Sequence, residues 1–249
     1  MDTPKNIKIA IIAALEREVK AAVKTWPIIE RDHGGRHYKF FESDRAVVVC
    51  GGIGSASARR AAEAAIALYS PLVVASVGFA GALDSQLKVG SLFSPRQVID
   101  ARDGSSRDTG IGGGTLVTYS SVANVQQKAK LASAYGGMAV DMEAAGVAQA
   151  AEARGLRFIA MKSISDEHDF DIPEMDRFIL NGRFHTGRFV LFAVCRPWLW
   201  SKLVQLAKNS SKAAYLLCNW LDQYNREGEI FGTNEPGLHL INRAGTKRV

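Results

Sequence analysis

Three acidic residues have the type and placement that acid–base chemistry requires. Glu18 follows the apolar run of residues 7–14, Asp166 follows the apolar run of residues 158–164, and Glu143 opens an alanine-rich segment. Carboxyl groups can give or take protons, and α/β folds present reactive residues at the carboxyl ends of strands. Ordinary structure offers another explanation, because first-turn carboxylates stabilise helices and a run of acids can form a solvated loop.

The elements that would position these carboxylates alternate between strands and helices. We predict strands at residues 7–14, 37–41, 46–50, 72–77, 92–100, 116–118 and 158–164, and helices from residue 15, at 56–69, 124–135, 144–153 and beyond 187. This order predicts an α/β fold with a mixed, mostly parallel sheet and helices on both faces. The carboxyl ends of parallel strands converge on one crevice, which would bring Glu18 and Asp166 together.

Two glycine-rich segments lie at predicted strand ends. Residues 51–55 (GGIGS) lead into a helix, and residues 78–83 (GFAGAL) follow a buried strand. A glycine turn at a helix N-terminus lets backbone N–H groups approach an anion or a hydroxylated ligand. The first segment is not a P-loop, since no Gly-Lys-Ser/Thr follows, and it lacks the dinucleotide-binding spacing. A tight turn that needs glycine backbone angles is the alternative explanation.

Composition limits the class of protein. The chain has 249 residues, of which 47% are hydrophobic, which suits one large α/β domain or one domain with an appendage. Cys50, Cys195 and Cys218 are odd in number and lack metal-binding spacing, which favours a reduced, cytoplasmic protein without a structural metal. The first residues do not resemble a signal peptide, and no apolar run reaches transmembrane length.

The positive charge is concentrated near the C-terminus. Of the formal net charge of +6, residues 185–249 contribute nine Lys/Arg against four Asp/Glu. We predict a main α/β domain (1–184), a helical extension packed on it (185–226) and a polar, partly flexible tail (227–249). The extension mixes aromatic and aliphatic residues with lysines, which indicates either peripheral membrane contact or packing on the domain or another subunit. Because the charge lies with apolar helices, we expect no nucleic-acid partner.

Five motifs in a fixed order connect the chain to a known family. They are IAIIAALEREV, GGIGSASA, SVGFAGAL, VDMEAAGVA and ISDEHD, and they span about residues 7–170. With these motifs the sequence resembles the nucleoside phosphorylase/nucleosidase superfamily, which includes the methylthioadenosine/S-adenosylhomocysteine nucleosidases. It looks closest to the hopanoid-associated phosphorylase branch, a resemblance that extends through the helices around residues 190–221. The resemblance implies one α/β domain with a partly barrel-like sheet, assembled as a homodimer or a larger homo-oligomer.

The resemblance also implies a role for each carboxylate in cleavage of an N-ribosyl bond. Asp166 would protonate or hydrogen-bond the purine at N7, Glu143 would accept hydrogen bonds from the ribose hydroxyls, and Glu18 would orient or deprotonate a water. The leaving purine needs a proton and the oxocarbenium-like sugar needs a nearby negative charge, so carboxyl groups suit this reaction. Asp166 would then have to hold a proton near neutral pH.

The other expected contacts surround these carboxylates. The predicted substrate-binding residues are Met142, Ser165, Ile53, Gly52, Phe79, Gly81 and Val122. Two positions depart from the family's pattern. Phe79 stands where many members have a hydroxyl group, which removes one expected contact to water or phosphate, and Lys162 stands where nucleosidases commonly have arginine.

The resemblance therefore implies an enzyme that acts on a purine nucleoside, with adenine favoured, that carries a 5′ substituent. Phosphorolysis and hydrolysis both remain open, so inorganic phosphate is an optional co-substrate and no cofactor or metal is expected. Adenosylhopane would be the substrate in the hopanoid branch. A methylthioadenosine/S-adenosylhomocysteine-type nucleosidase and a non-catalytic nucleoside-binding protein on the same fold are the alternatives.

Overall fold

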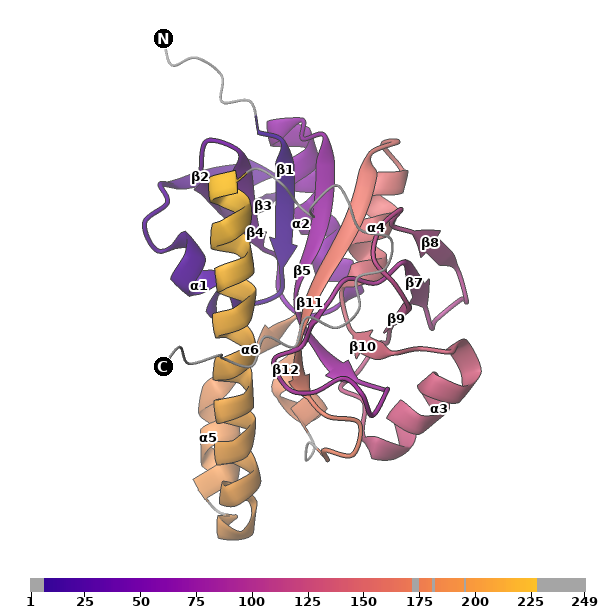
Figure 1. Cartoon of the computed structure of the whole chain (residues 1–249). Helices are drawn as coiled ribbons and strands as arrows, with labels where there is room; N and C mark the ends of the chain where they lie inside the picture. Colours follow the sequence, from indigo (N-terminus) through magenta and orange to yellow (C-terminus); the bar gives the residue numbers. More distant parts are fainter. Residues whose placement is uncertain (1–6, 172–174, 181, 195, 228–249) are drawn as a thin grey trace, which may run out of the picture.

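The computed structural model describes residues 7–171, 175–180, 182–194 and 196–227. Within them a central sheet has helices on both sides, and a long C-terminal helix runs along the molecule (Figure 1). The predicted polar tail lies outside the described residues from residue 228 onward, as does Cys195.

Eleven of the described strands form one sheet. They are β1 (Ile9–Ala13), β2 (Ile28–His33), β3 (Arg36–Glu42), β4 (Ala46–Cys50), β5 (Val73–Ala82), β6 (Leu92–Phe93), β7 (Gln97–Asp100), β8 (Ser106–Asp108), β9 (Thr115–Thr118), β10 (Ala139–Asp141) and β11 (Arg157–Asp166). Their order is β2-β3-β4-β1-β5-β10-β9-β7-β8, and β11 pairs with β5 and β6. β12 (Ile179–Leu180) and β13 (Arg183–Phe184) form a separate small hairpin.

The centre of the sheet is parallel. β1 pairs in parallel with β4 and β5, and β11 pairs in parallel with β5. The continuous apolar sequence of β1 is buried along its whole length, as expected for a strand covered on both faces. The antiparallel pair of β3 and β4 matches the hairpin predicted from residues 37–41 and 46–50. The prediction of a mixed, mostly parallel sheet flanked by helices is therefore confirmed.

Several predicted boundaries were wrong. The strand predicted at 72–77 continues to Ala82, so the glycine-rich segment 78–82 is part of β5 rather than a segment that follows it. Its last residues pair with β10 in antiparallel fashion, which curves the sheet. The strand predicted at 92–100 is two strands, β6 and β7, with Pro95 between them, because proline cannot donate a ladder hydrogen bond. Residues 103–114, for which no strand or helix was predicted, contain the short strand β8.

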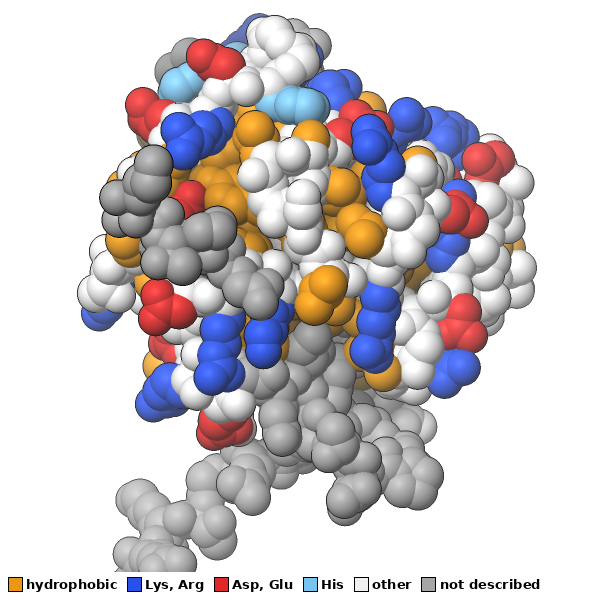
Figure 2. Space-filling view, turned by 90° about the horizontal axis from the view of Figure 1, so that it is seen from above, with side chains coloured by type: hydrophobic (Ala, Val, Ile, Leu, Met, Phe, Trp, Pro, Cys, Tyr) orange, Lys and Arg blue, Asp and Glu red, His pale blue; other side chains and the backbone are white. Residues whose placement is uncertain are grey.

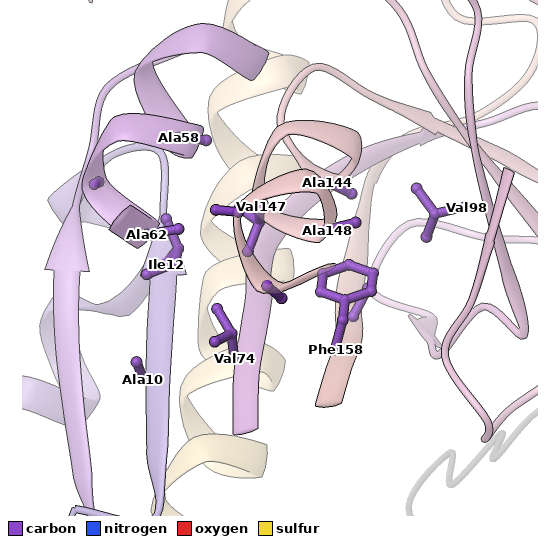
Figure 3. Packing of buried hydrophobic residues seen from close by; sticks show 14 of the residues in the cluster. Ala10, Ile12, Ala58, Ala62, Val74, Val98, Ala144, Val147, Ala148 and Phe158 are labelled. Atoms are coloured by element: carbon purple, nitrogen blue, oxygen red, sulfur yellow. The ribbon is translucent and has the colours of Figure 1, made fainter. Parts of the chain in front are cut away.

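The helices cover both faces of the sheet. They are α1 (Glu16–Val23), α2 (Ser55–Tyr69), α3 (Val125–Tyr135), α4 (Ala144–Glu152), α5 (Thr186–Val194) and α6 (Trp200–Glu227), with 3-10 turns at Met175–Phe178 and Pro197–Leu199. α2 and α4 pack together over one face, where Ala58, Ala62, Val147 and Phe158 are among the buried side chains (Figure 3). α1 and the C-terminal half of α6 pack against the other core cluster, which includes Leu217 and Leu221.

Close helix packing explains one glycine of α4. A Cβ atom on Gly146 would collide with the backbone carbonyl of Ser55, so only glycine lets α4 lie against the beginning of α2. α3 begins at a capping box in which Asn124 and Gln127 each accept the other's backbone N–H at 2.9 Å.

The C-terminal helices differ from the rest of the molecule. α5 and the first half of α6 extend beyond the sheet as a hairpin (Figure 1). None of the described helices has the length and apolar character needed to cross a membrane. At the opposite end of the molecule, Lys and Arg side chains are interspersed with acidic ones rather than gathered in one groove (Figure 2).

Candidate active site

The carboxyl ends of the central strands surround one cavity with a volume of ≈ 500 Å³. Glu18 reaches it from the first turn of α1, Glu143 from the start of α4, and Asp166 from the last position of β11. The structure thus brings the three carboxylates together from segments far apart in the sequence. Most of the predicted substrate-binding residues also line the cavity, namely Met142, Ser165, Ile53, Phe79, Gly81 and Val122.

Glu18 is held by backbone hydrogen bonds at the beginning of α1. The N–H groups of Ala14 and Leu15 donate to its Oε2 atom at 3.1 and 3.2 Å. Burial raises the pKa of Glu18, although the hydrogen bond from Leu15 and the charge of Lys162 oppose this effect. A carboxylate with a raised pKa is a better proton acceptor near neutral pH. Glu18 therefore both caps the helix and presents a base to the cavity.

Glu143 is half-buried and receives two backbone hydrogen bonds. The N–H of Gly54 donates to Oε1 at 2.8 Å, and the N–H of Met142 donates to Oε2 at 3.2 Å. Burial, followed by the nearby charge of Asp141, raises the pKa of Glu143 to about 8. The bond from Gly54 joins the glycine turn before α2 to the N-terminus of α4, so the turn positions this carboxyl group.

A fully buried ion pair lies beside the two glutamates. Lys162 Nζ is 2.8 Å from Asp141 Oδ2 and donates a second bond to Ser76 Oγ at 2.9 Å. Asp141 also accepts hydrogen bonds from Thr118 Oγ1 at 2.7 Å and from the N–H of Ala144 at 2.9 Å. The lysine charge acts on both glutamates and partly offsets the effect of burial on their pKa.

Asp166 has partners on both carboxyl oxygens. Ser165 Oγ donates to Oδ1 at 2.7 Å. Lys128 of α3 forms an ion pair with Oδ2 and donates a further bond to the carbonyl oxygen of Glu167 at 2.6 Å. Lys128 lines the cavity and is only 2% exposed. The sequence prediction did not include this lysine.

Two glycines of β5 make room for the carboxylates. A Cβ atom on Gly78 would lie 3.0 Å from Glu18 Oε2, and one on Gly81 would lie 2.8 Å from Asp166 Oδ2. Neither glycine has a positive φ angle, so space rather than backbone conformation accounts for both. The glycine-rich segment is therefore a strand that two acidic side chains approach closely.

The structure does not bring Gly52 to the cavity. Its N–H is bonded to the carbonyl of Ala14 at 3.0 Å, and a Cβ atom there would lie 2.7 Å from the carbonyl oxygen of Gly182. Its φ of 93° also favours glycine. Gly52 thus forms the turn, as the alternative explanation proposed, whereas the adjacent Ile53 lines the cavity.

The other half of the cavity is apolar and comes from the C-terminal part of the chain. The residues that contribute to it include Met175, Ile179, Phe184, Phe189, Leu203 and Leu206. Phe178 packs edge-on against Phe184, Phe189 and Phe192, with ring centroids 5.1 to 6.5 Å apart, which stabilises this wall. The sequence identified these helices as apolar but gave no indication that they form a wall of the site.

Two hydrogen bonds fasten this wall to the main domain. The N–H of Val122 donates to Asp176 Oδ1 at 2.7 Å, and the N–H of Ile53 donates to the carbonyl of Gly182 at 2.7 Å. Val122 and Ile53 both line the cavity, so the segment around β12 and β13 is tied to its rim at two points.

A family model described as "Phosphorylase superfamily" matches residues 8–124 and 113–186, which together are most of the chain. The chain belongs to the phosphorylase superfamily. The match covers β1 to β11 and therefore all three carboxylates of the cavity. No curated protein matches the sequence.

Solved structures share this superfamily fold. The methylthioadenosine/S-adenosylhomocysteine nucleosidase of Helicobacter pylori, solved in complex with a substituted pyrrolidin-3-ol, is 19% identical, with 88% of this chain and 99% of that chain covered and a TM-score of 0.62. Futalosine hydrolase of the same organism is 19% identical, with 88% and 98% covered and a TM-score of 0.63. The S-adenosylhomocysteine nucleosidase of Streptococcus pyogenes is 20% identical, with 88% and 97% covered and a TM-score of 0.61.

Within the described residues, this superfamily member has no cluster of three or more His, Cys, Asp and Glu side chains that could hold a metal ion. The charged groups that line its cavity are instead the three carboxylates with Asp141, Arg17 and Lys128. Proton transfer and hydrogen bonding are the chemistry that these groups can provide.

Proposed function

We propose that this protein cleaves the N-ribosyl bond of an adenine nucleoside, with water as the favoured nucleophile. The observation that carries the proposal is the convergence of Glu18, Glu143 and Asp166 on one cavity. Membership of the phosphorylase superfamily and similarity in fold to nucleosidases support the same reaction class. A non-catalytic nucleoside-binding protein is less favoured, because binding alone does not require three carboxyl groups withdrawn from solvent.

On the purine side, Asp166 hydrogen-bonds or protonates N7 as the bond to C1′ breaks. The purine would otherwise leave as an anion, so a proton delivered at this atom lowers the barrier. Ser165 holds Asp166 in place through the bond to Oδ1. The electron pair of the broken bond stays with the purine, which leaves as a neutral base.

On the sugar side, Glu143 accepts hydrogen bonds from the ribose hydroxyls, and in its ionised form it offsets the positive charge of the oxocarbenium-like transition state. Glu18 takes a proton from the water that attacks C1′. Two features favour water over phosphate: Glu18 would repel an approaching anion, and Phe79 provides no hydroxyl group to bind one. The raised pKa of Glu18 suits it to accept this proton.

The decisive measurement is free purine released from adenosine, methylthioadenosine and inosine, with and without inorganic phosphate. We expect release without phosphate, and we expect Asp166→Asn to abolish it in protein that circular dichroism shows to be folded at the assay temperature. Full activity of Asp166→Asn would contradict the proposal. Loss of release in phosphate-free buffer would leave the bond cleavage in place but replace water by phosphate.

A second cavity supports phosphorolysis as the alternative. It has a volume of ≈ 970 Å³, is lined by Arg36, Arg60, Arg102 and Arg183, and shares Ile53 with the first cavity. Arginine is well suited to bind phosphate through paired N–H groups. If phosphate is the nucleophile, Arg60→Met should raise the KM for phosphate, whereas hydrolysis should be unaffected by this substitution.

The apolar wall supports a substrate with an apolar 5′ substituent. The carboxylates would hold the base and ribose, which leaves Phe189, Leu203 and Leu206 to contact the 5′ group. Adenosylhopane, the substrate implied by the hopanoid-associated branch, has a group of this kind, and methylthioadenosine is the small alternative. We expect KM to fall as the 5′ alkyl chain of a series of adenosines lengthens. An increase in KM along the series would favour methylthioadenosine.

We further propose that the protein works in the cytoplasm as a homo-oligomer and touches the membrane through its C-terminal arm, defined as residues 186–212. Val190, Val194, Trp198 and Val204 of the arm are exposed, Trp198 at 71%. From residue 183 to residue 221 the chain has six Lys/Arg and no Asp/Glu. Exposed tryptophan with basic charge is typical of surfaces that bind anionic lipid.

Vesicle binding tests the arm. We expect the protein to sediment with vesicles that contain anionic phospholipid at low salt and to remain in solution with neutral vesicles. Trp198→Ser should weaken binding, whereas Tyr215→Ser, which alters an exposed residue of α6 outside the arm, should not. Absence of binding to anionic vesicles, together with a Trp198→Ser variant that dissociates into monomers, would assign the arm to a contact between subunits.

A further inference from the structure

Lys128 is buried where a lysine is ordinarily solvated. It lies on α3, a surface helix on which Lys130 is exposed in the usual way. Its side chain is 2% exposed and that of its partner Asp166 is 7% exposed. Withdrawing an ammonium and a carboxylate from water is costly, and replacing such a pair by apolar residues is often neutral or stabilising. Stability alone therefore does not explain this lysine.

The strand opposite the pair is shaped to admit both side chains. A Cβ atom on Gly81 would lie 2.8 Å from Asp166 Oδ2 and 3.3 Å from Lys128 Cε. Lys128 also lines the cavity together with Asp166, and its remaining bond goes to the carbonyl oxygen of Glu167. The ammonium group is thus fixed at the carboxyl group that faces the substrate site.

The contact has a chemical consequence for proton delivery. The ammonium group of Lys128 contacts the carboxyl group of Asp166 directly, so a proton can pass between them. The two groups share one transferable proton, because ammonium with carboxylate and amine with carboxylic acid contain the same number of protons. The pair can supply the proton that the proposed reaction requires.

We propose that Lys128 is the positioning residue and proton reservoir for Asp166, a role that rests on the proposed N-ribosyl cleavage. As the C1′–N bond breaks, its electron pair moves to the purine, which takes a proton through Asp166, and Lys128 replaces that proton. Water forms the new C1′–O bond and gives its proton to Glu18. The step leaves Lys128 as the amine, Asp166 as the carboxylate and Glu18 as the acid. Exchange with solvent then restores the starting state.

The role of Lys128 can be tested by comparing kcat for two substrates, of which only one has a leaving group that needs a proton. Adenine needs a proton to leave, whereas 4-nitrophenolate is a stable anion that leaves a riboside without one. We expect Lys128→Met to lower kcat for the adenine nucleoside by about 10² to 10⁴-fold, the usual range for loss of acid catalysis. The same variant should stay within about tenfold of the unmodified enzyme on the 4-nitrophenyl riboside. Lys130→Met, on the same helix but exposed, is the control and should change neither rate.

The Lys128→Arg variant tests whether Lys128 acts by supplying a proton or by its positive charge alone. Arginine keeps the positive charge but does not release a proton in the accessible pH range. The proposal expects this variant to be nearly as slow as Lys128→Met on the adenine nucleoside and active on the 4-nitrophenyl riboside. Full activity of Lys128→Arg, or an equal loss on both substrates, would overturn it. If the unmodified protein releases neither leaving group, the proposed function itself fails, which is a distinguishable result.

Discussion

Two buried lysine–aspartate pairs lie beside the same cavity and differ in their surroundings. In the first, Lys162 does not line the cavity and is bonded to Ser76 as well as Asp141, whereas Asp141 lines the cavity and also accepts bonds from Thr118 and Ala144. In the second, Lys128 and Asp166 both line the cavity. A lysine away from the cavity can hold structure together, whereas a lysine that borders the cavity can also supply a proton to the site. The position of the lysine relative to the cavity therefore separates the roles of two chemically identical pairs.

The largest effect on stability is expected for Lys162→Met. This substitution leaves Asp141 as a buried charge without its counterion, which typically costs about 3–5 kcal/mol. Lys128→Met should cost less, because the side chain of Asp166 is 7% exposed whereas that of Asp141 is 0% exposed. Urea denaturation at neutral pH measures both, with Lys130→Met as a surface control expected within about 0.5 kcal/mol of the unmodified protein. Equal losses for the two buried lysines would remove the distinction between the pairs.

The next effect concerns catalysis by Glu18. Glu18→Gln removes the proposed base, so hydrolytic purine release should fall by about 10² to 10⁴-fold. The amide keeps the carbonyl oxygen that accepts the N–H groups of Ala14 and Leu15, so the fold should persist. Glu16→Gln, an exposed position on the same helix, serves as the control and should leave the rate unchanged. Normal release by Glu18→Gln would show that another group activates the nucleophile.

Glu143 should make the free energy of unfolding depend on pH. Burial raises its pKa from 4.5 to about 8, so the folded protein retains a proton that the unfolded chain releases. Its contribution to the free energy of unfolding is therefore fully present below about pH 4.5, is lost as the pH rises and levels off above about pH 8. Glu143→Gln cannot ionise, so its stability relative to the unmodified protein should increase across this window.

Denaturation series between pH 5 and pH 8 measure this effect. Glu152→Gln, an exposed position on the same helix, should give a difference from the unmodified protein that does not change with pH. A constant difference for Glu143→Gln as well would mean that Glu143 is ionised throughout the range. It would then resemble Asp141 in having a partner for its charge.

The sequence predicted those features that depend on local pattern. The apolar runs of β1, β5 and β11 identified the parallel core, and the position of Glu18 and Asp166 after two of these runs placed them at one edge of the sheet. Lys128 could not be recognised in this way. A lysine on an amphipathic helix has the same local pattern whether it points to water or to Asp166, and only the tertiary fold decides.

The apolar wall of the cavity could not be predicted from local sequence pattern either. The aromatic and aliphatic residues of α5 and α6 were recognised as apolar, but periodicity does not indicate which surface they cover. Phe189 and Leu203 line the cavity because the chain returns to it after β11, a long-range path that no local signal encodes. In contrast, the spacing of Gly78 and Gly81 did hold a signal, which was interpreted as the end of a strand rather than as space for acidic side chains.

Gly81→Ala gives the smallest expected effect and tests the geometry most directly. The added methyl group would lie 2.8 Å from Asp166 Oδ2 and 3.3 Å from Lys128 Cε, so one member of the pair must move. Overpacking of this kind typically costs about 1–3 kcal/mol. A displacement near 1 Å can lower kcat by as much as about 10²-fold.

Gly113→Ala is the matched control, because a Cβ atom there meets nothing within 4 Å. If Gly81→Ala lowers kcat for adenine nucleosides but spares the 4-nitrophenyl riboside, the methyl group acts through the proton on the pair. A uniform loss would mean that it disturbs substrate binding instead, and the pair would then be no more than a structural contact.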